Sequence, residues 1–312
     1  MKTGRSRPSW FTRFWAVVRY EMLWNIRKKK FIGILIVAFV LATLSWALPL
    51  ISSNASGQPI NANPNYDVSF SIPSFGMFLF ALITAMNSIS SEFESGTIVP
   101  LLTKPVSRTM VFLGKLLAAF IIILVTYTIL FVYVVIGGAL VYGPQDNLQL
   151  VPLGLFGNII STFVWIAIIL AAGALSKSTI ISTLVALGFF IGILFAVPIV
   201  SLFAGPSPAL NYVPGGGASG TMITTQGVIT VGGGTDNIGT DLINYALYSS
   251  ANVDFNSTSV QIQDGQPHIT QTFAYAESMS LITLRSVATA VAYIVVFLVI
   301  AWIAVKRAQV LE

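Results

Sequence analysis

Six long apolar stretches, separated by shorter polar ones, dominate the hydropathy pattern of the chain. They lie near residues 31–51, 70–90, 112–140, 153–175, 179–203 and 286–305. Each is long enough to cross the roughly 30 Å hydrocarbon core of a bilayer, which takes about 20 residues of helix. The pattern therefore predicts an all-α polytopic membrane protein with six transmembrane helices.

The composition agrees with a membrane protein and narrows its chemistry. Of 312 residues, 55% are hydrophobic and 9% are charged, whereas soluble domains carry about 25% charged residues. The lack of cysteine excludes disulfides and thiolate metal sites. His268 is the only histidine, so a histidine-based metal centre or catalytic triad is not expected. We therefore expect no catalytic site, metal or cofactor in this chain.

Lysine and arginine are distributed unevenly around the six stretches. Nine of the sixteen lie in residues 1–30, and most of the others lie in 104–115, at Lys177 and at 306–307. Only Arg285 belongs to the opposite set of loops. Because cytoplasmic segments are enriched in Lys and Arg, this predicts a multi-pass protein of the cell membrane with both termini in the cytoplasm. The net charge of +5 then reflects orientation, and no nucleic-acid partner is expected.

Residues 1–30 form a basic tail that includes an amphipathic segment. After Ser9 or Thr12, either of which is placed to cap a helix, apolar side chains recur at steps of three or four: Phe11, Trp15, Val18, Met22 and Ile26. The other side carries Arg13, Arg19 and Tyr20, and Glu21 follows. A basic, aromatic-rich helix of this kind suits the membrane interface. An ordinary positively charged flank with tryptophan anchors is the alternative interpretation.

A short polar stretch at residues 90–108 separates the second and third apolar runs. Ser91 and Glu94 have the spacing of a capping box, which marks a helix start. Ser107 or Thr109 is placed to cap the following apolar helix.

The helix that begins in this stretch is predicted to be short. Gly96 weakens it, Pro100 interrupts it and Pro105 prevents its continuation. We therefore expect a helix near 91–103 that lies across the end of the membrane part, where a soluble partner can bind.

The segment 204–285 is too long for a structureless connection. Its glycine runs at 215–217 and 232–234 are interpreted as turns or flexible links. The predicted elements are a strand at 227–231, a helix at 241–250 and a hairpin from 260 to 273 with a tight turn at Asp264-Gly265 and an edge strand containing Pro267. We expect a small extracytoplasmic α/β cap. A ligand-binding domain or a disordered loop are the alternatives.

Two asparagines are candidates for modification on the predicted outer side. Asn54 and Asn256 each begin an Asn-x-Ser/Thr sequon, whose glycosylation depends on the organism. The predicted organisation has four parts: 1–30 tail and interfacial helix, 31–203 helices one to five, 204–285 extracytoplasmic domain, and 286–312 helix six with a cytoplasmic tail.

The apolar runs contain no charged residue or histidine well inside them. Ion-coupled transporters usually keep such groups inside the membrane as relays or ion sites. The chain also lacks a phosphate-binding loop, since Gly114-Lys115 is followed by leucine and has no glycine five residues earlier. If this protein drives uphill transport, the energy must arrive through another polypeptide.

Small residues mark expected helix contacts. Gly188 and Gly192 in the fifth run form a small-x-x-x-small pair, which permits close approach of two backbones. The contact is either packing within the subunit or a dimer face.

The polar stretch and its flanks resemble a known family. Glu92-x-Glu94-x-Gly96-Thr97, then Lys-Pro-Val-Ser-Arg ending at Arg108, then Gly-Lys, is similar to the loop after the second helix of ABC-2 type permeases, the membrane subunits of ABC transporters. The N-terminal helix, with Trp15, Arg19 and Glu21, is also similar to theirs.

The resemblance implies a function and its partners. The short helix would be a coupling helix that docks into a separate cytoplasmic ABC ATPase, which binds ATP and Mg. The residues expected at or beside that contact are Glu92, Glu94, Gly96, Thr97, Pro105 and Arg108. Two six-helix subunits, alike or different, would form the substrate path in the bilayer, with export favoured. Aromatic residues of the first and fifth helices, Phe39, Trp46, Phe189 and Phe195, would then be candidates for an apolar substrate surface.

Two other functions remain open from the sequence. One is a non-transporting membrane assembly or sensor protein whose polar stretch binds another soluble factor. The other is a secondary transporter, which the uncharged apolar runs disfavour. The substrate is not specified by any motif.

Overall fold

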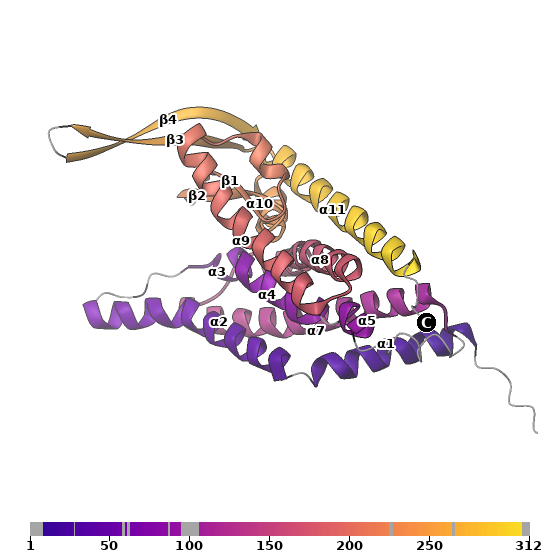
Figure 1. Cartoon of the computed structure of the whole chain (residues 1–312). Coiled ribbons are helices and arrows are strands. Elements are labelled where there is room, and N and C mark those ends of the chain that lie inside the picture. The colour runs from indigo at the N-terminus through magenta and orange to yellow at the C-terminus, as the bar shows by residue number, and fades with distance from the viewer. Residues whose placement is uncertain are drawn as a thin grey trace, which may run out of the picture.

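The computed structural model describes residues 9–27, 29–57, 60, 63–86, 88–94, 106–224, 227–263 and 266–307. Within them, six helices are long and apolar enough to cross a membrane, which agrees with the predicted mostly helical class (Figure 1). They are α2 (Lys29–Ser56), α4 (Ser74–Ala85) followed by α5 (Ser90–Glu94), α7 (Arg108–Tyr142), α8 (Val151–Ser176), α9 (Thr179–Ala204) and α11 (Met279–Arg307).

Two helix starts differ from the prediction for local reasons. α4 begins at Ser74 and not near residue 70, because proline at 73 disfavours helical geometry at the residue before it. The short helix α3 (Tyr66–Ser69) occupies part of that region instead. α11 begins at Met279, seven residues before the predicted 286, so Arg285 lies inside the helix and not at its edge. Its charge is balanced there by Glu277, whose carboxylate accepts at 2.6 and 2.8 Å.

The N-terminal helix α1 (Trp10–Ile26) begins where predicted. The Ser9 hydroxyl accepts a hydrogen bond from the amide of Thr12 at 3.2 Å and so caps the helix. Of the predicted apolar face, Val18 is buried, whereas Phe11 and Trp15 are exposed and stack on each other. The buried face of α1 also contains two polar residues, Glu21 and Asn25, which the hydropathy pattern did not place inside.

The segment after α9 folds into a sheet with one helix. The elements are η2 (Pro208–Tyr212), β1 (Gly216–Thr224), β2 (Gly227–Gly234), α10 (Ile238–Tyr248), β3 (Asn252–Gln263) and β4 (Gln266–Ser278). The strands run antiparallel in the order β2-β1-β3-β4. The predicted strand, helix and hairpin are all present, and β4, which contains Pro267, is an edge strand as expected. We call residues 205–278 the cap.

The glycine runs in the cap are not simply turns, contrary to the prediction. Gly217 and Gly233 lie within β1 and β2, facing the side chain of Asn211. That buried amide accepts a hydrogen bond from the Ala218 backbone at 2.8 Å. A side chain at either glycine would collide with Asn211. Glycine is therefore needed for close packing and not for flexibility.

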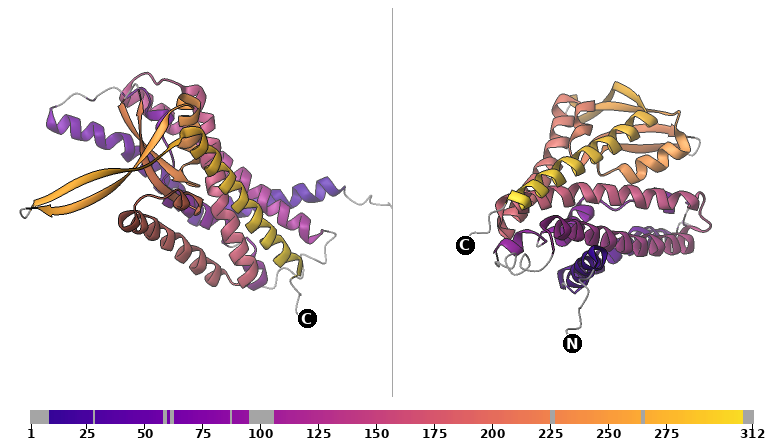
Figure 2. Two further views of the ribbon diagram at one scale, coloured as in Figure 1. Left: turned by 90° about the horizontal axis from the view of Figure 1, so that it is seen from above. Right: turned by 90° about the vertical axis from the view of Figure 1, so that its right-hand side faces the viewer.

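The outer half of the β3–β4 hairpin extends well past the rest of the cap (Figures 1 and 2). Its strands stay paired up to Gln263 and Gln266, and a register shift between Phe255 and Asn256 separates this part from the sheet. The predicted turn, Asp264-Gly265, lies outside the described residues.

The cap packs directly on the helical bundle through α10 and α8. A Cβ at Gly157 would lie 2.5 Å from the backbone of Gly239, and one at Gly154 would lie 2.7 Å from Ile243. The two glycines thus give α10 room to approach α8. The views in Figures 1 and 2 place this contact at one end of the bundle, with the start of α7 and the end of α11 toward the other.

Candidate functional site: the elbow

A buried cluster of three charged side chains lies where α1, α5 and α7 meet. The Lys115 ammonium of α7 lies 2.6 Å from a carboxylate oxygen of Glu21 in α1 and 2.7 Å from one of Glu92 in α5. The side chains of Lys115 and Glu21 are 5% and 6% exposed. We call α5, the first two turns of α7 and the turn at 177–178 the elbow.

Local sequence explains why Lys115 is buried against α1. The preceding residue, Gly114, has no side chain, and a Cβ there would lie 2.8 Å from Val17 of α1. The two helices therefore approach closely enough for Glu21 to reach the ammonium group. A buried lysine is stable only when paired, since an isolated charge in an apolar environment is very costly. The two carboxylates supply that pairing.

Glu94 contacts the start of α9. Its carboxylate accepts hydrogen bonds from the Thr179 amide at 2.8 Å and the Ser178 hydroxyl at 2.9 Å. These groups start α9, so Glu94 caps a helix 84 residues later in the chain. α5 begins at Ser90, one residue before the predicted capping residue Ser91, and the Glu94 carboxylate satisfies donors at the start of another helix. Ser90 supports the same contact through the hydroxyl of Thr179 at 3.0 Å.

Arg108 connects the elbow to the last helix. Its guanidinium donates to the backbone carbonyls of Lys306 at 3.1 Å and Val305 at 3.4 Å, at the end of α11. A cation at the C-terminus of a helix is favourable, because the last carbonyls lack partners within the helix. Ser107 caps α7 at the same place by accepting from the Met110 amide, as predicted.

Three of the predicted contact residues, Gly96, Thr97 and Pro105, lie outside the described residues, as does most of the predicted helix at 91–103. Its described beginning, α5, follows α4 closely. Among the predicted residues of α1, Glu21 joins the buried cluster, while Trp15 and Arg19 are exposed. Glu21, Glu92 and Lys115 all lie in the segments that resemble the family, but nothing in their spacing along the chain indicates that the three side chains meet.

Gly188 and Gly192 of α9 contact no other part of the described chain. A Cβ at either position would meet nothing within 4 Å. The neighbouring large apolar residues of α9 are also exposed, among them Leu184, Phe189 and Phe195. The space beside both glycines is therefore open in the described part of the chain, and their role as a dimer face stays a prediction. α9 therefore presents an apolar face with small residues at its centre.

An apolar cavity of about 400 Å³ lies between α2 and α4. Its lining includes Leu41 and Ser45 from α2, Phe75 and Leu79 from α4, and Tyr66 from α3. Phe39 and Trp46, expected at a substrate surface, both contact α7: Phe39 makes an edge contact with Tyr133, and the Trp46 indole lies against Gly137. The two aromatic residues thus pack α2 against α7. A side chain at Gly137 would collide with the Trp46 indole, which explains the glycine at this position.

The apolar runs contain no acidic residues well inside them, but two aspartates of the cap are buried against the membrane helices. Asp236 accepts a hydrogen bond from the buried indole of Trp165 in α8 at 3.0 Å, and Asp241 accepts one from Ser286 in α11 at 2.9 Å. Burial raises the pKa of Asp236 to about 6 and that of Asp241 well above its usual range, although Ser74 and Trp165 near the first, and Ser286 near the second, favour the charged forms.

A third acid, Asp67 of α3, is buried against Gly138 of α7. Burial raises its pKa to about 6. Sequence inspection missed all three acids because they lie outside the apolar runs and reach the helices only through folding.

Comparison with known proteins gives consistent results. A family model described as "ABC-2 family transporter protein" matches residues 15–310. The chain is 27% identical over 197 residues to the "Probable ABC transporter permease protein NosY" of Pseudomonas aeruginosa, covering 60% of this chain and 70% of that protein. It is 32% identical over 103 residues to the protein of the same name from Stutzerimonas stutzeri, covering 32% of this chain and 36% of that protein.

Proposed function

Because this chain belongs to the ABC-2 transporter family and is a multi-pass membrane protein, we propose that it is the permease subunit of an exporter driven by a separate cytoplasmic ATPase. ATP and Mg bind to that partner, and the elbow is the surface that it contacts. Both termini and the elbow lie in the cytoplasm, with the cap on the opposite side, in keeping with the distribution of Lys and Arg.

The observation that carries the proposal is the set of bonds leaving the elbow. Lys115 joins α5 and α7 to α1, Glu94 joins α5 to α9, and Arg108 joins α7 to α11. A displacement of the elbow would therefore be transmitted to three other helices, α1, α9 and α11, by direct polar contacts. Such a node suits a permease whose helices move as rigid elements when a soluble subunit pushes on one end. An ordinary connecting loop has no need of a buried ion cluster.

The transport cycle follows from this arrangement. ATP closes the partner dimer, the elbow moves with it, and α1, α9 and α11 follow through the three contacts. Two permease subunits then rock against each other to open the path outward. α1, with Phe11 and Trp15 exposed, lies at the membrane interface and supports the elbow from the side.

The substrate path is formed by two copies of a six-helix subunit, or by this chain and a related one. The glycine pair and exposed apolar face of α9 support this placement, because small residues permit close helix approach in membranes. The cavity between α2 and α4 is lined mostly by apolar side chains, and Phe75 in its lining contacts the inner side of α9 at Phe190. An apolar or amphipathic substrate fits such walls.

The test is coupling between ATP hydrolysis and transport. Purified alone, the chain is expected to hydrolyse no ATP, and a dimeric ATPase encoded beside it should copurify on coexpression. Gly96→Trp should abolish stimulation of that ATPase while the permease remains inserted. Arg307→Trp, at an exposed position near the same end, is the matched control.

Three results would reject the proposal: ATPase activity of the single chain, absence of any copurifying ATPase, or equal effects of the two variants. The second would favour an assembly or sensor protein. Glu92→Arg is unsuitable as a test, because it places a cation beside the buried Lys115 and damages folding.

A further inference from the structure

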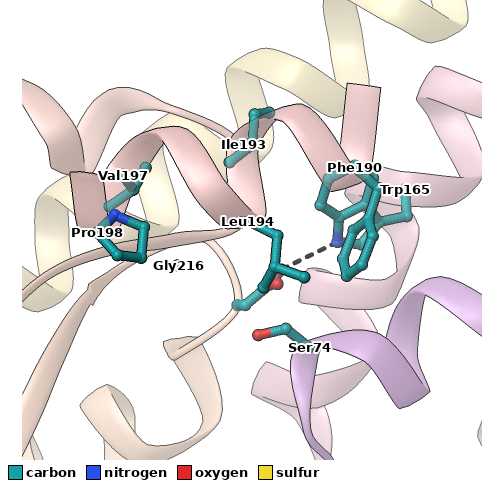
Figure 3. Close-up of a pocket in the computed structure, with 11 residues that line it drawn as sticks. Ser74, Trp165, Phe190, Ile193, Leu194, Val197, Pro198 and Gly216 are labelled. Carbon is teal, nitrogen blue, oxygen red and sulfur yellow. Dashed lines mark hydrogen bonds between the residues drawn. The ribbon is translucent and has the colours of Figure 1, made fainter. Parts of the chain in front are cut away.

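A small, partly open space lies at the junction of the cap with α4, α8 and α9. It has a volume of about 130 Å³, far above the roughly 10–15 Å³ that one water requires. Figure 3 shows its walls: Trp165 and Phe190 on one side, Pro198 and Val197 on the other, and Ser74 below. The backbone of Gly215, Gly216 and Gly217 completes it.

The carboxyl group of Asp236 lines this space and is incompletely bonded. The residue is 2% exposed. One carboxylate oxygen accepts from the Trp165 indole, drawn as the dashed line in Figure 3, while the other, Oδ2, is buried and makes no hydrogen bond. No ion pair in the described ranges of the chain involves Asp236.

The Oδ2 atom of this carboxylate can still accept a hydrogen bond from a positively charged donor. Buried charges in proteins are normally paired, because leaving one unpaired is expensive. Hydrogen bonds from ammonium groups to carboxylates are among the stronger ones. Aromatic rings such as those of Trp165 and Phe190 attract cations as well. The remaining wall is aliphatic, which suits a short hydrocarbon chain.

From this geometry we infer that the space is a binding site for a primary ammonium group carrying a short apolar chain. The ammonium donates to Asp236 Oδ2, beside the Ser74 hydroxyl, whose own proton is directed at the same carboxyl group. The inference does not depend on the chain being a transporter. The ammonium can belong to a free amine or to an ethanolamine lipid headgroup, and the experiment separates these sources.

The probe is n-butylammonium, added at pH 7.5 to the full-length protein in detergent. Trp165 donates to the same carboxyl group, so its fluorescence reports the site, and Trp165→Phe identifies its signal among the six tryptophans. We expect a saturable change with the ammonium ion and none with n-butanol, its neutral isostere. Asp236→Asn should weaken binding at least 10-fold, whereas Asp146→Asn, at an exposed acid, should leave it unchanged.

A second variant guards against misfolding of the first. Gly216 lines the space, and a Cβ there meets nothing within 4 Å. Gly216→Val should therefore fill the site, keep the carboxyl group and reduce binding. Equal binding of butanol, or unchanged binding in Asp236→Asn, would show an apolar cavity only and overturn the inference. Absence of any butylammonium binding would overturn it too.

The natural source of the ammonium group is identified by measuring butylammonium binding in nanodiscs of different lipid composition. If a lipid headgroup is the natural ligand, phosphatidylethanolamine should compete with butylammonium and phosphatidylcholine should not. If it is a free amine, the two lipids should give the same affinity.

Discussion

Lys115 of α7 and Glu21 of α1 form an ion pair of 2.6 Å that is almost completely shielded from solvent. The two residues are 94 positions apart, and Gly114 is what lets their helices approach. The pair fixes the N-terminal helix to the elbow, and the shared contact of Lys115 with Glu92 brings in α5. The described part of the elbow is thus held together by buried contacts between three helices.

Lys115→Met should be strongly destabilising. It leaves the carboxylates of Glu21 and Glu92 buried without a cation, and removing one partner of a buried pair costs about 3–5 kcal/mol. The measurement is the thermal unfolding midpoint in detergent. Arg19→Met, at an exposed cation of α1, is the matched control and should change little. A midpoint equal to that of the control would mean that the cluster contributes no stability.

Gly157→Ala should loosen the contact between the cap and the bundle. The new Cβ would meet the backbone of Gly239 at 2.5 Å, and backbone cannot move aside as a flexible side chain does. Overpacking of this kind typically costs about 1–3 kcal/mol. Gly33→Ala is the control, since a Cβ there meets nothing. Hydrogen exchange of α10 amides should rise in the first variant only; unchanged exchange would show that α8 and α10 do not touch as described.

The cap should bind the bundle more strongly in acid. Burial raises the pKa of Asp236 from 3.8 to about 6, so its neutral form is favoured in the folded protein. Its contribution to stability is full below about pH 4 and is lost as pH rises through about 6, a change of about 3 kcal/mol at 1.36 kcal/mol per pKa unit. Asp67 and Asp241, with pKa values also raised, act in the same direction.

Asp236→Asn isolates the contribution of this one group. The variant should be more stable than the parent at pH 8 and similar to it at pH 4, as measured by thermal unfolding across that range. Parallel pH curves for the two proteins would show that Asp236 keeps an ordinary pKa.

The orientation can be tested by cysteine labelling, because the chain has no native cysteine. Single cysteines at Ser56, Gln145 and Gln261 should react with an impermeant thiol reagent in intact cells. Cysteines at Ser95 and Arg307 should react only after permeabilisation. Labelling of Ser95 from outside would reverse the proposed orientation and remove the elbow from reach of a cytoplasmic partner.

The proposed dimer predicts a specific cross-link through α9. A cysteine at Gly188 or Gly192 should form a disulfide-linked pair under mild oxidation, since the two positions face away from the rest of the subunit. A cysteine at Val295, on an exposed face of α11, should not. Equal cross-linking at all three positions would indicate random collision.

The sequence alone determined the class of this protein. Twenty or more consecutive apolar residues have few alternatives to a membrane helix, so all six candidate spans were predictable and α9 was predicted to within one residue. Helix caps and turn residues act locally, which is why Ser9, Ser107 and the β3–β4 hairpin were also predictable.

Tertiary structure decided which polar groups act together. Glu94 had the right spacing to cap its own helix, yet it caps α9, because the donors at Thr179 are brought beside it by folding. The glycine runs suggested flexibility, but in the fold Gly217 and Gly233 pack closely against the side chain of Asn211. Asp236 and Lys115 reach partners 71 and 94 residues away. Local pattern encodes helix and strand, whereas the energy of a buried charge depends on neighbours that only the fold supplies.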